Sequence, residues 1–291
     1  MYPSRFAYQR VSILEEALDI LARTQDDAKV LAGGQSLIPL MKLRLAAPKR
    51  LLDIGRLAPL KGIREEDGSL SIGALTRHAD LEAASLPRSF ELLREAARGI
   101  GDPQVRNMGT IGGALAEADP SGDWAAALLA LSVSVVCRSA AASRRVVLGE
   151  FFLDPYTSAL KPDEILTEVQ IELPARPSGG AYLKLERKAG DFPIASAAVF
   201  LQAGARGEIA SVGVGLAGVG LTPIKAQATE AYLKGKALGE EPASWAAEML
   251  RGEIHPLSDL RGSADYKREV AATLFQRALK LAWARAMRSD Q

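Results

Sequence analysis

Two glycine-rich segments carry residue types that bind phosphate. The first, Ala32-Gly33-Gly34-Gln35-Ser36, follows a short apolar run and precedes a segment that we expect to be helical. Glycines allow a sharp turn and let a ligand approach the backbone N–H groups, and a helix N-terminus adds a partial positive charge. This segment is therefore a candidate phosphate site. The alternative is an ordinary strand-to-helix turn in which Ser36 caps the helix.

The second segment is Gly109-Thr110-Ile111-Gly112-Gly113-Ala114, with Asp119, Ser121 and Asp123 downstream. Thr110 offers a hydroxyl, the glycines permit close approach, and Asp123 has oxygens that accept hydrogen bonds from ribose hydroxyls. In the alternative interpretation, Ser121 or Asp123 only caps the helix expected from Trp124. Two such segments in one chain fit a ligand with two linked phosphates.

A third glycine-rich segment matches the dinucleotide fingerprint but lacks its context. The run Gly213-Val-Gly215-Leu-Ala-Gly218 fits G-x-G-x-x-G. That pattern binds a nucleotide only where a strand ends and a helix begins within the glycines. Here small and apolar residues continue to Pro223, which favours a glycine-rich strand.

Residues that ligate metals are scarce. The chain has one cysteine, Cys137, and two histidines, His78 and His255. An iron–sulfur cluster needs four thiolates and a structural zinc site four Cys or His ligands, and no Asp-x-Asp-x-Asp loop is present. We expect a buried apolar Cys137, His78 at an exposed helix start and His255 in a turn, with no catalytic residue and no metal ligand among them. Any difficult chemistry must come from an organic cofactor or another subunit.

Composition excludes several classes of protein. The 291 residues are 48% hydrophobic and 24% charged, with 36 basic and 35 acidic side chains and a net charge of +1. Such a chain is globular, and no global field attracts nucleic acid or an anionic membrane. No apolar run approaches the length of about 20 residues that spans a bilayer, and no signal-peptide core is seen. We therefore expect a cytoplasmic protein.

The N-terminal half alternates between helix and strand patterns. Leu14, Ala17, Leu18 and Leu21 predict a helix that ends near Arg23, with Ser12 and Glu15 as a capping box. Other strands and helices are predicted from apolar runs and from breaks at glycine and proline. The strands are 29–32, 50–54, 69–74 and 165–173, and the helices follow Ser36, cover 76–98 with a break at Pro87, and cover 124–131.

The segment from Pro174 to Gly180 is the best candidate for a linker, because two prolines and two glycines fall within it. Beyond it, strands are predicted at 182–186, 194–201 and 209–216, and helices at 225–234, 243–251 and 265–288. Strands followed by helices indicate an α+β unit with helices packed on one face of a small antiparallel sheet.

Three segments together resemble one known family. They are Ala32-Gly33-Gly34-Gln35-Ser36-Leu37 with Lys42-Leu43-Arg44, then Val105 to Gly113 with Ala118-Asp119-Pro120, and finally Tyr182 to Phe192. They resemble the FAD-binding medium subunit of molybdenum hydroxylases (the xanthine dehydrogenase family), above all that of aerobic carbon monoxide dehydrogenase. The resemblance covers nearly the whole chain in the same order.

The resemblance implies a fold. Residues 1–176 would form an α+β FAD-binding domain of the PCMH type, which is vanillyl-alcohol-oxidase-like, with two α/β subdomains at about 1–57 and 58–176. Residues 177–291 would form a domain like the C-terminal domain of the carbon monoxide dehydrogenase flavoprotein, with a three-stranded antiparallel sheet and a helical bundle.

The resemblance also implies roles for individual residues. The stretches Ala32 to Ser36 and Thr110 to Ala114 would hold the FAD pyrophosphate. Asp123 would contact the ribose or adenine end, Leu166 would pack near the adenine or flavin, and Lys184 would lie near the flavin ring. From its residue type alone, Lys184 with Arg187 and Lys188 is equally explained as a solvated basic edge.

Three positions depart from the family pattern. Ala114 stands where Asn or Ser is common, so a side-chain contact to phosphate is lost. Glu117 stands where His or Asn is common, and its charge would lower the flavin potential. Phe192 replaces a tyrosine that would cover the isoalloxazine, so it keeps the ring without the hydroxyl.

The implied function is electron transfer within a larger enzyme. The chain would carry FAD, accept electrons from the [2Fe–2S] clusters of a small subunit, and pass them to an external acceptor. The large subunit would carry the molybdenum cofactor and act on the substrate, and the complex would be a dimer of heterotrimers, a heterohexamer. The alternatives are a self-sufficient flavin oxidase or reductase and a nucleotide-binding module without redox activity.

Overall fold

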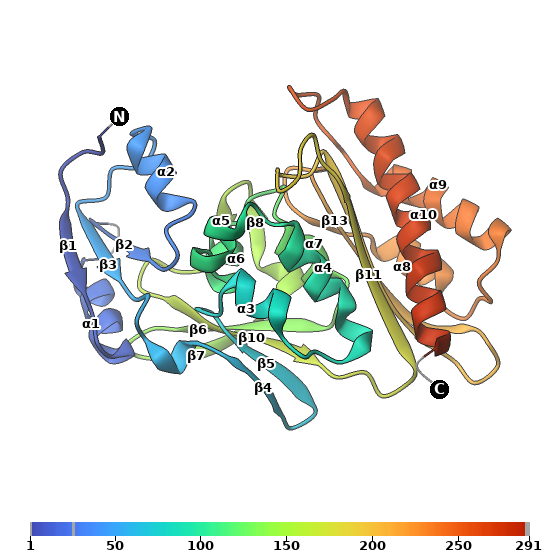
Figure 1. The fold of residues 1–291 in the computed structure, drawn as a ribbon, viewed down its shortest axis with the longest axis horizontal. Helices are drawn as coiled ribbons and strands as arrows, with labels where there is room; N and C mark the ends of the chain where they lie inside the picture. Colours follow the sequence, from blue (N-terminus) through green and yellow to red (C-terminus); the bar gives the residue numbers. More distant parts are fainter. Residues whose placement is uncertain (1, 25–26, 289–291) are drawn as a thin grey trace.

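The computed structural model describes residues 2–24 and 27–288, which form a mixed α+β structure with three successive parts (Figure 1). The N-terminal part has a parallel sheet of order β1 (Ala7–Arg10), β3 (Arg50–Asp53), β2 (Ala28–Leu31). Helix α1 (Leu14–Thr24) buries its apolar stripe in the same cluster as Leu52, and α2 (Leu37–Lys42) follows β2. The predicted helices and strands of this part are confirmed.

The predicted capping box at Ser12 and Glu15 is wrong. Because α1 begins at Leu14, the backbone N–H of Ser12 donates to Glu16 Oε2 over 3.2 Å. Glu15 instead forms an ion pair of 3.5 Å with Arg138 of the next part.

The middle part is an antiparallel five-stranded sheet covered on one face by short helices (Figure 1). Its strand order is β4 (Ile63–Glu66), β5 (Ser69–Gly73), β10 (Ile165–Glu172), β6 (Val133–Arg138), β7 (Ser143–Val147). The helices are α3 (His78–Ala83), α4 (Glu91–Gly99), α5 (Pro103–Met108), α6 (Ile111–Glu117) and α7 (Asp123–Leu129). A small hairpin, β8 (Phe152–Asp154) and β9 (Thr157–Ser158), precedes β10. The alternating segment 165–173 is confirmed as the central strand.

The C-terminal part contains the three predicted strands and a short fourth strand. The sheet order is β11 (Ser178–Leu185), β12 (Ala195–Ala203), β13 (Ile209–Ala217), β14 (Ile224–Lys225). Two residues are too few to show an alternating pattern, so β14 was not predictable. The predicted helices are present as α8 (Gln227–Leu233), α9 (Glu240–Glu253) and α10 (Ala264–Arg288), and α10 lies along the sheet (Figure 1).

Glycines in this sheet serve close packing. The segment Gly213 to Gly218 is confirmed as strand rather than a nucleotide loop, because β13 continues to Ala217. A Cβ on Gly213 or Gly215 would lie less than 3.0 Å from a backbone oxygen of α7 or of its C-cap residue, Ala130. The predicted linker is wrong in its last residues, since Gly179 and Gly180 belong to β11, where Gly179 packs on α10 and Gly180 on Leu92.

Candidate cofactor-binding site

The two candidate phosphate-binding segments are in direct contact. Gly33 lies just after β2, and a Cβ at that position would fall less than 3.0 Å from Met108 O and 2.8 Å from Gly109 Cα. A Cβ on Gly113 would be 3.9 Å from Ala32 Cβ. The two segments, which are more than seventy residues apart in the chain, therefore meet through glycine backbones.

The first turn offers backbone donors. Gly34 has φ +74°, which is the left-handed conformation that glycine favours. The N–H groups of residues 33–37 donate to no acceptor within the described part of the chain, and the first such bond of the helix is from Ile38 to Gly34 O. Ser36 occupies the N-cap position of α2 but makes no capping hydrogen bond, so the capping alternative for Ser36 is wrong. Gln35 and Ser36 are exposed.

The second segment is expected from its glycines to be a loop, but most of it is helical, because α6 begins at Ile111. Thr110 caps this helix, and its Oγ1 accepts a hydrogen bond of 3.2 Å from the Gly113 N–H. The N–H groups of Ile111 and Gly112 donate to Thr76 O and Ala74 O at 3.1 and 2.9 Å. These three amides are therefore already bonded within the protein.

Burial separates the predicted contact residues of α6 into two groups. Ile111 is 0% exposed and Gly112 is also buried, which leaves them no surface for a ligand. Gly113 is exposed and Ala114 half-buried, so these two residues face outward near the first turn. The second segment therefore forms a packed surface rather than a set of free hydrogen-bond donors, and Gly113 is the residue on it that a ligand can reach.

A buried charge cluster surrounds Lys184. Its side chain is 8% exposed, so the interpretation as a solvated edge is wrong for Lys184, whereas Arg187 and Lys188 are exposed. The ammonium Nζ lies 3.0 Å from Asp123 Oδ1, 2.9 Å from Glu186 Oε2, 2.7 Å from Gly99 O and 2.9 Å from Asp191 O. Its three protons are therefore all taken by protein oxygens, and a ligand near Lys184 meets the side-chain stem or displaces a partner.

Asp123 belongs to the same cluster. It is 6% exposed and accepts a hydrogen bond of 2.6 Å from the Tyr182 hydroxyl, while Gly122, not Asp123 or Ser121, is the N-cap of α7. Burial raises the pKa of Asp123, and the Lys184 ammonium opposes this shift. Because Asp123 and Lys184 form an ion pair, the structure does not place them at opposite ends of an extended dinucleotide.

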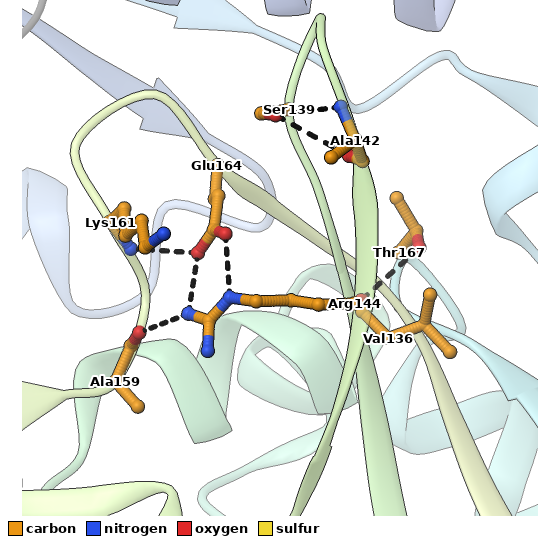
Figure 2. A network of polar contacts seen from close by, with 8 residues as sticks. All are labelled: Val136, Ser139, Ala142, Arg144, Ala159, Lys161, Glu164 and Thr167. Carbon is orange, nitrogen blue, oxygen red and sulfur yellow. Dashed lines mark hydrogen bonds and ion pairs between the residues drawn. The ribbon is translucent and has the colours of Figure 1, made fainter.

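Leu166 is buried on β10, and the loop before it is fixed by an ion pair (Figure 2). Arg144 donates to both oxygens of Glu164 at 2.7 Å and to Ala159 O at 2.6 Å. The Lys161 N–H donates to Glu164 at 2.9 Å, and these bonds lower the pKa of Glu164 against its burial. This network lies directly before β10, which begins at Ile165.

Phe192 lies on the loop between β11 and β12 and is 45% exposed. The Arg261 guanidinium is 5.9 Å from the centre of its ring, within the range of a cation–π contact. A shallow pocket beside this loop is lined by Arg187, Asp191, Asp259, Leu260 and Arg261. Burial raises the pKa values of Glu117 and Asp119. Asp119 raises that of Glu117 further, whereas the Arg261 guanidinium opposes the shift of Asp119.

The histidine next to these turns departs from our prediction. His78 is 4% exposed rather than at an exposed helix start, because its Nδ1 accepts a hydrogen bond of 3.0 Å from the indole N–H of Trp124. Burial, together with Arg77 and Arg106, lowers the pKa of His78 to about 4. Cys137 is buried as predicted, and burial raises its pKa to about 11. His255 lies outside helices and strands but not in the predicted turn, and its backbone N–H donates to Val219 O over 3.0 Å.

Arg77 is a residue near the site that was not predicted. Its guanidinium donates to Met108 O, the oxygen that Gly33 approaches, and its backbone pairs with Thr110. A cation therefore stands where the two turns meet. No periodic pattern marks a single arginine before a helix, so the sequence carries no signal for Arg77. Its role depends on the glycine-rich segment that it meets only in the folded chain.

Neither a metal cluster nor a membrane span is found in the residues that the structure describes. No group of three or more His, Cys, Asp or Glu side chains is arranged to hold a metal ion in residues 2–24 and 27–288. Within the same ranges, no helix combines the length and apolar character needed to cross a bilayer.

Comparisons with known proteins agree with this architecture. Residues 4–175 match the family described as "FAD binding domain in molybdopterin dehydrogenase", and residues 180–282 match "CO dehydrogenase flavoprotein C-terminal domain". The carbon monoxide dehydrogenase medium chain of Hydrogenophaga pseudoflava is 39% identical over 98% of this chain and 99% of its own. The glyceraldehyde dehydrogenase medium chain of Sulfolobus acidocaldarius is 40% identical over 96% of this chain and 99% of its own.

A solved structure shows the same fold. A chain of carbon monoxide dehydrogenase from Hydrogenophaga pseudoflava, in a form that lacks the Mo-pyranopterin moiety, superposes on this chain with a TM-score of 0.94 at 41% identity. The superposition covers 98% of this chain and 99% of that chain. The chain therefore belongs to the family of FAD-binding medium subunits of molybdenum hydroxylases.

Proposed function

We propose that this chain binds FAD where the two turns meet and serves as the electron-transfer subunit of a heteromeric molybdenum hydroxylase in the cytoplasm. The observation that carries the proposal is the contact between Gly33 and the Met108–Gly109 backbone, which makes one site of two distant segments. Family membership supports the identity of the ligand. In the same proposal, the FAD-binding domain is 1–176, with subdomains at about 1–57 and 58–176, and the C-terminal domain is 177–291.

The residues present fit a dinucleotide phosphate. The unpartnered N–H groups of residues 34–37 would bind phosphate oxygens, while Gly33, which is buried, would hold this turn against the second segment. Arg77 adds positive charge at the same place. Gly113 and Ala114 would lie against the pyrophosphate. Thr110 is 2% exposed, and its hydroxyl would act by capping α6, where it accepts from Gly113. Bound FAD would supply one- and two-electron redox chemistry.

The remaining predicted residues would shape the rest of the site. Leu166 would pack against the adenine or flavin, and Phe192 would cover the flavin ring without offering a hydroxyl. Asp123 and Lys184, which are joined in one cluster, would contact the same part of the cofactor. Glu117 would place a carboxyl group nearby, and burial and Asp119 raise its pKa.

The proposal includes partner subunits. Relatives of this chain are named medium chains, which implies smaller and larger chains beside them. A single cysteine cannot ligate an iron–sulfur cluster, so [2Fe–2S] clusters would reside on a small subunit and the molybdenum cofactor on a large subunit. A dimer of such heterotrimers is the assembly that we propose.

Purification of the chain alone, and then together with the products of neighbouring genes, tests the proposal. We expect the visible spectrum of a flavin, release of FAD on denaturation, and no substrate oxidation until the partners and their molybdenum and iron are present. Colourless protein with affinity for adenine nucleotides would instead favour a nucleotide-binding module. Turnover of an organic substrate by the chain alone would favour a self-sufficient oxidase.

A further inference from the structure

A buried histidine lies directly behind the second turn and has no part in the function proposed above. His78 is the first residue of α3, and its Nδ1 accepts the 3.0 Å hydrogen bond from Trp124 Nε1. An indole N–H can only donate, so Nδ1 is the unprotonated nitrogen and the neutral ring carries its proton on Nε2. Trp124, itself 1% exposed, thus fixes both the orientation and the tautomer of His78.

The opposite edge of the imidazole lies against Gly109. A Cβ on Gly109 would stand 2.5 Å from His78 Nε2 and 2.7 Å from Cδ2. Gly109 has φ −62° and ψ 148°, a conformation open to any residue, so close packing requires glycine here: the ring lies nearest, and Val105 O would be 3.2 Å from the same Cβ. The backbone N–H of His78 also donates to Gly109 O over 3.1 Å. The ring and the backbone of one residue therefore hold Gly109.

Gly109 in turn supports the first turn, since a Cβ on Gly33 would lie 2.8 Å from Gly109 Cα. Trp124, His78, Gly109 and Gly33 form an unbroken series of contacts from α7 to the phosphate-binding turn. Packed backbones transmit a displacement because little free volume remains between them. A shift of the imidazole would thus move the surface on which the first turn rests.

We propose that His78, oriented by Trp124, is a positioning residue that holds the Gly109 turn against the Gly33 turn and so sets the geometry of FAD binding. This inference rests on the proposed function for the identity of the ligand, but the contacts that define it lie within the chain. Burial beside Arg77 and Arg106 keeps the ring uncharged at neutral pH, with a pKa of about 4. The ring therefore acts by shape and hydrogen bonding rather than by charge.

The test uses the full chain and two readouts, FAD affinity by fluorescence titration and hydrogen exchange of residues 105–113 in the FAD-free protein. Trp124→Phe removes the indole N–H and keeps an aromatic ring. We expect it to weaken FAD binding about tenfold, as for one lost buried hydrogen bond, and to speed exchange at the Gly109 turn. Trp245→Phe is the matched control, because Trp245 is 58% exposed on α9 and should change neither readout.

A double-mutant cycle isolates the contact between the ring and Gly109. Gly109→Ala should weaken FAD binding about a hundredfold in the otherwise unchanged chain, because the new methyl group meets the ring. In a His78→Ser background the same change should cost less than about tenfold, since the obstructing ring is gone. Additive effects would overturn the proposal.

The Trp124→Phe result decides the proposal even if the double variant does not fold. Unchanged exchange at 105–113 in Trp124→Phe would overturn it, whatever the FAD affinity. If the unaltered chain binds no FAD, the proposed function fails, while faster exchange in Trp124→Phe would still support the positioning of the Gly109 turn by His78.

Discussion

Close approach, rather than backbone conformation, explains the glycine at position 33. Of Gly33 and Gly34, only Gly34 has a positive φ. A side chain on Gly33 would instead collide with the Met108 and Gly109 backbone. Overpacking against a backbone cannot be relieved by a rotamer change, so the two turns must separate. The requirement for glycine at this position is therefore a requirement of the site and not of the turn itself.

The substitution Gly33→Ala should weaken FAD binding about a hundredfold, which corresponds to about 2.7 kcal/mol, because the added methyl group separates the turns. The affinity is measured by titrating FAD-free protein and following flavin fluorescence. Gly252→Ala on α9 is the control, since a Cβ there meets nothing within 4 Å, and it should leave affinity unchanged and raise helix stability by up to about 1 kcal/mol. Equal affinity of the two variants would contradict the contact between the turns.

The buried histidine makes stability depend on pH. His78 has a pKa of about 4 in the folded chain against 6.5 for an ordinary histidine. Between these values the unfolded state binds more protons, so stability falls as the pH falls from 6.5 towards 4, by about 3 kcal/mol for this group. Urea unfolding across this range should show a smaller loss in His78→Gln than in the unaltered chain. Parallel curves for the two proteins would show that His78 is not responsible.

The sequence predicted which residue types surround the site better than it predicted what they do. Gly33 and Gly113 stood out because glycine pairs beside helices are recognisable locally. Ile111 and Gly112 were grouped with them, although their burial and bonded amides give them a supporting role. Arg77 and His78 could not be recognised, because their importance comes from contacts with residues 108–110, which no local pattern reveals.

At the scale of elements, Lys184 joins three segments that are distant in the chain. From β11 it reaches the end of α4 through Gly99 O, the start of α7 through Asp123, and the 186–192 loop through Asp191 O. A Cβ on Gly190 of this loop would lie 3.1 Å from Gly101 Cα and closer still to Gly101 O, so glycines make the same junction possible. The loop that carries Phe192 is thus fixed from both sides.

Removal of the ammonium should loosen this junction. Lys184→Met keeps the side-chain stem but leaves the buried Asp123 and the half-buried Glu186 without a cation, so we expect a loss of about 3–5 kcal/mol in the free energy of unfolding. Lys225→Met offers a comparison, because that lysine pairs with Glu230 at 2.9 Å but its side chain is 30% exposed, and about 1 kcal/mol is expected. Guanidinium unfolding measures both. A loss no greater for Lys184 than for Lys225 would argue against the buried cluster.

Periodicity predicted the elements themselves with few errors. The alternation at 165–173 became β10, and the apolar stripe of α1 lies in its expected cluster. The errors fall where neighbours in space decide the outcome: Gly179 and Gly180 resemble a linker by composition, but they are strand residues that let α10 and Leu92 approach. Composition cannot distinguish a glycine that bends the chain from one that makes room for another segment.

On the scale of the whole molecule, the middle and C-terminal parts share one core. Trp124 and Leu128 of α7 lie in the same buried cluster as Tyr182, Ala198 and Ala217 of the C-terminal sheet. Phe90 stacks on Phe200 with ring centres 5.7 Å apart, which adds an aromatic contact across the same boundary. The boundary proposed near residue 177 therefore separates two sheets, but not two cores that would be stable on their own.

A substitution in this shared core should therefore destabilise both parts together. Gly215→Ala places a methyl group less than 3.0 Å from Ala126 O of α7 and 3.0 Å from the N of its C-cap residue, Ala130, and neither backbone can move without separating helix from sheet. We expect a loss of about 3 kcal/mol. Hydrogen exchange should accelerate in β10 of the middle part as well as in β13, because cooperative unfolding follows the continuous core and not the order of the chain.

Gly149→Ala, where a Cβ meets nothing within 4 Å, serves as the control. Faster exchange confined to β13 would show that the two parts unfold independently, and that α7 is unaffected by events in the C-terminal sheet.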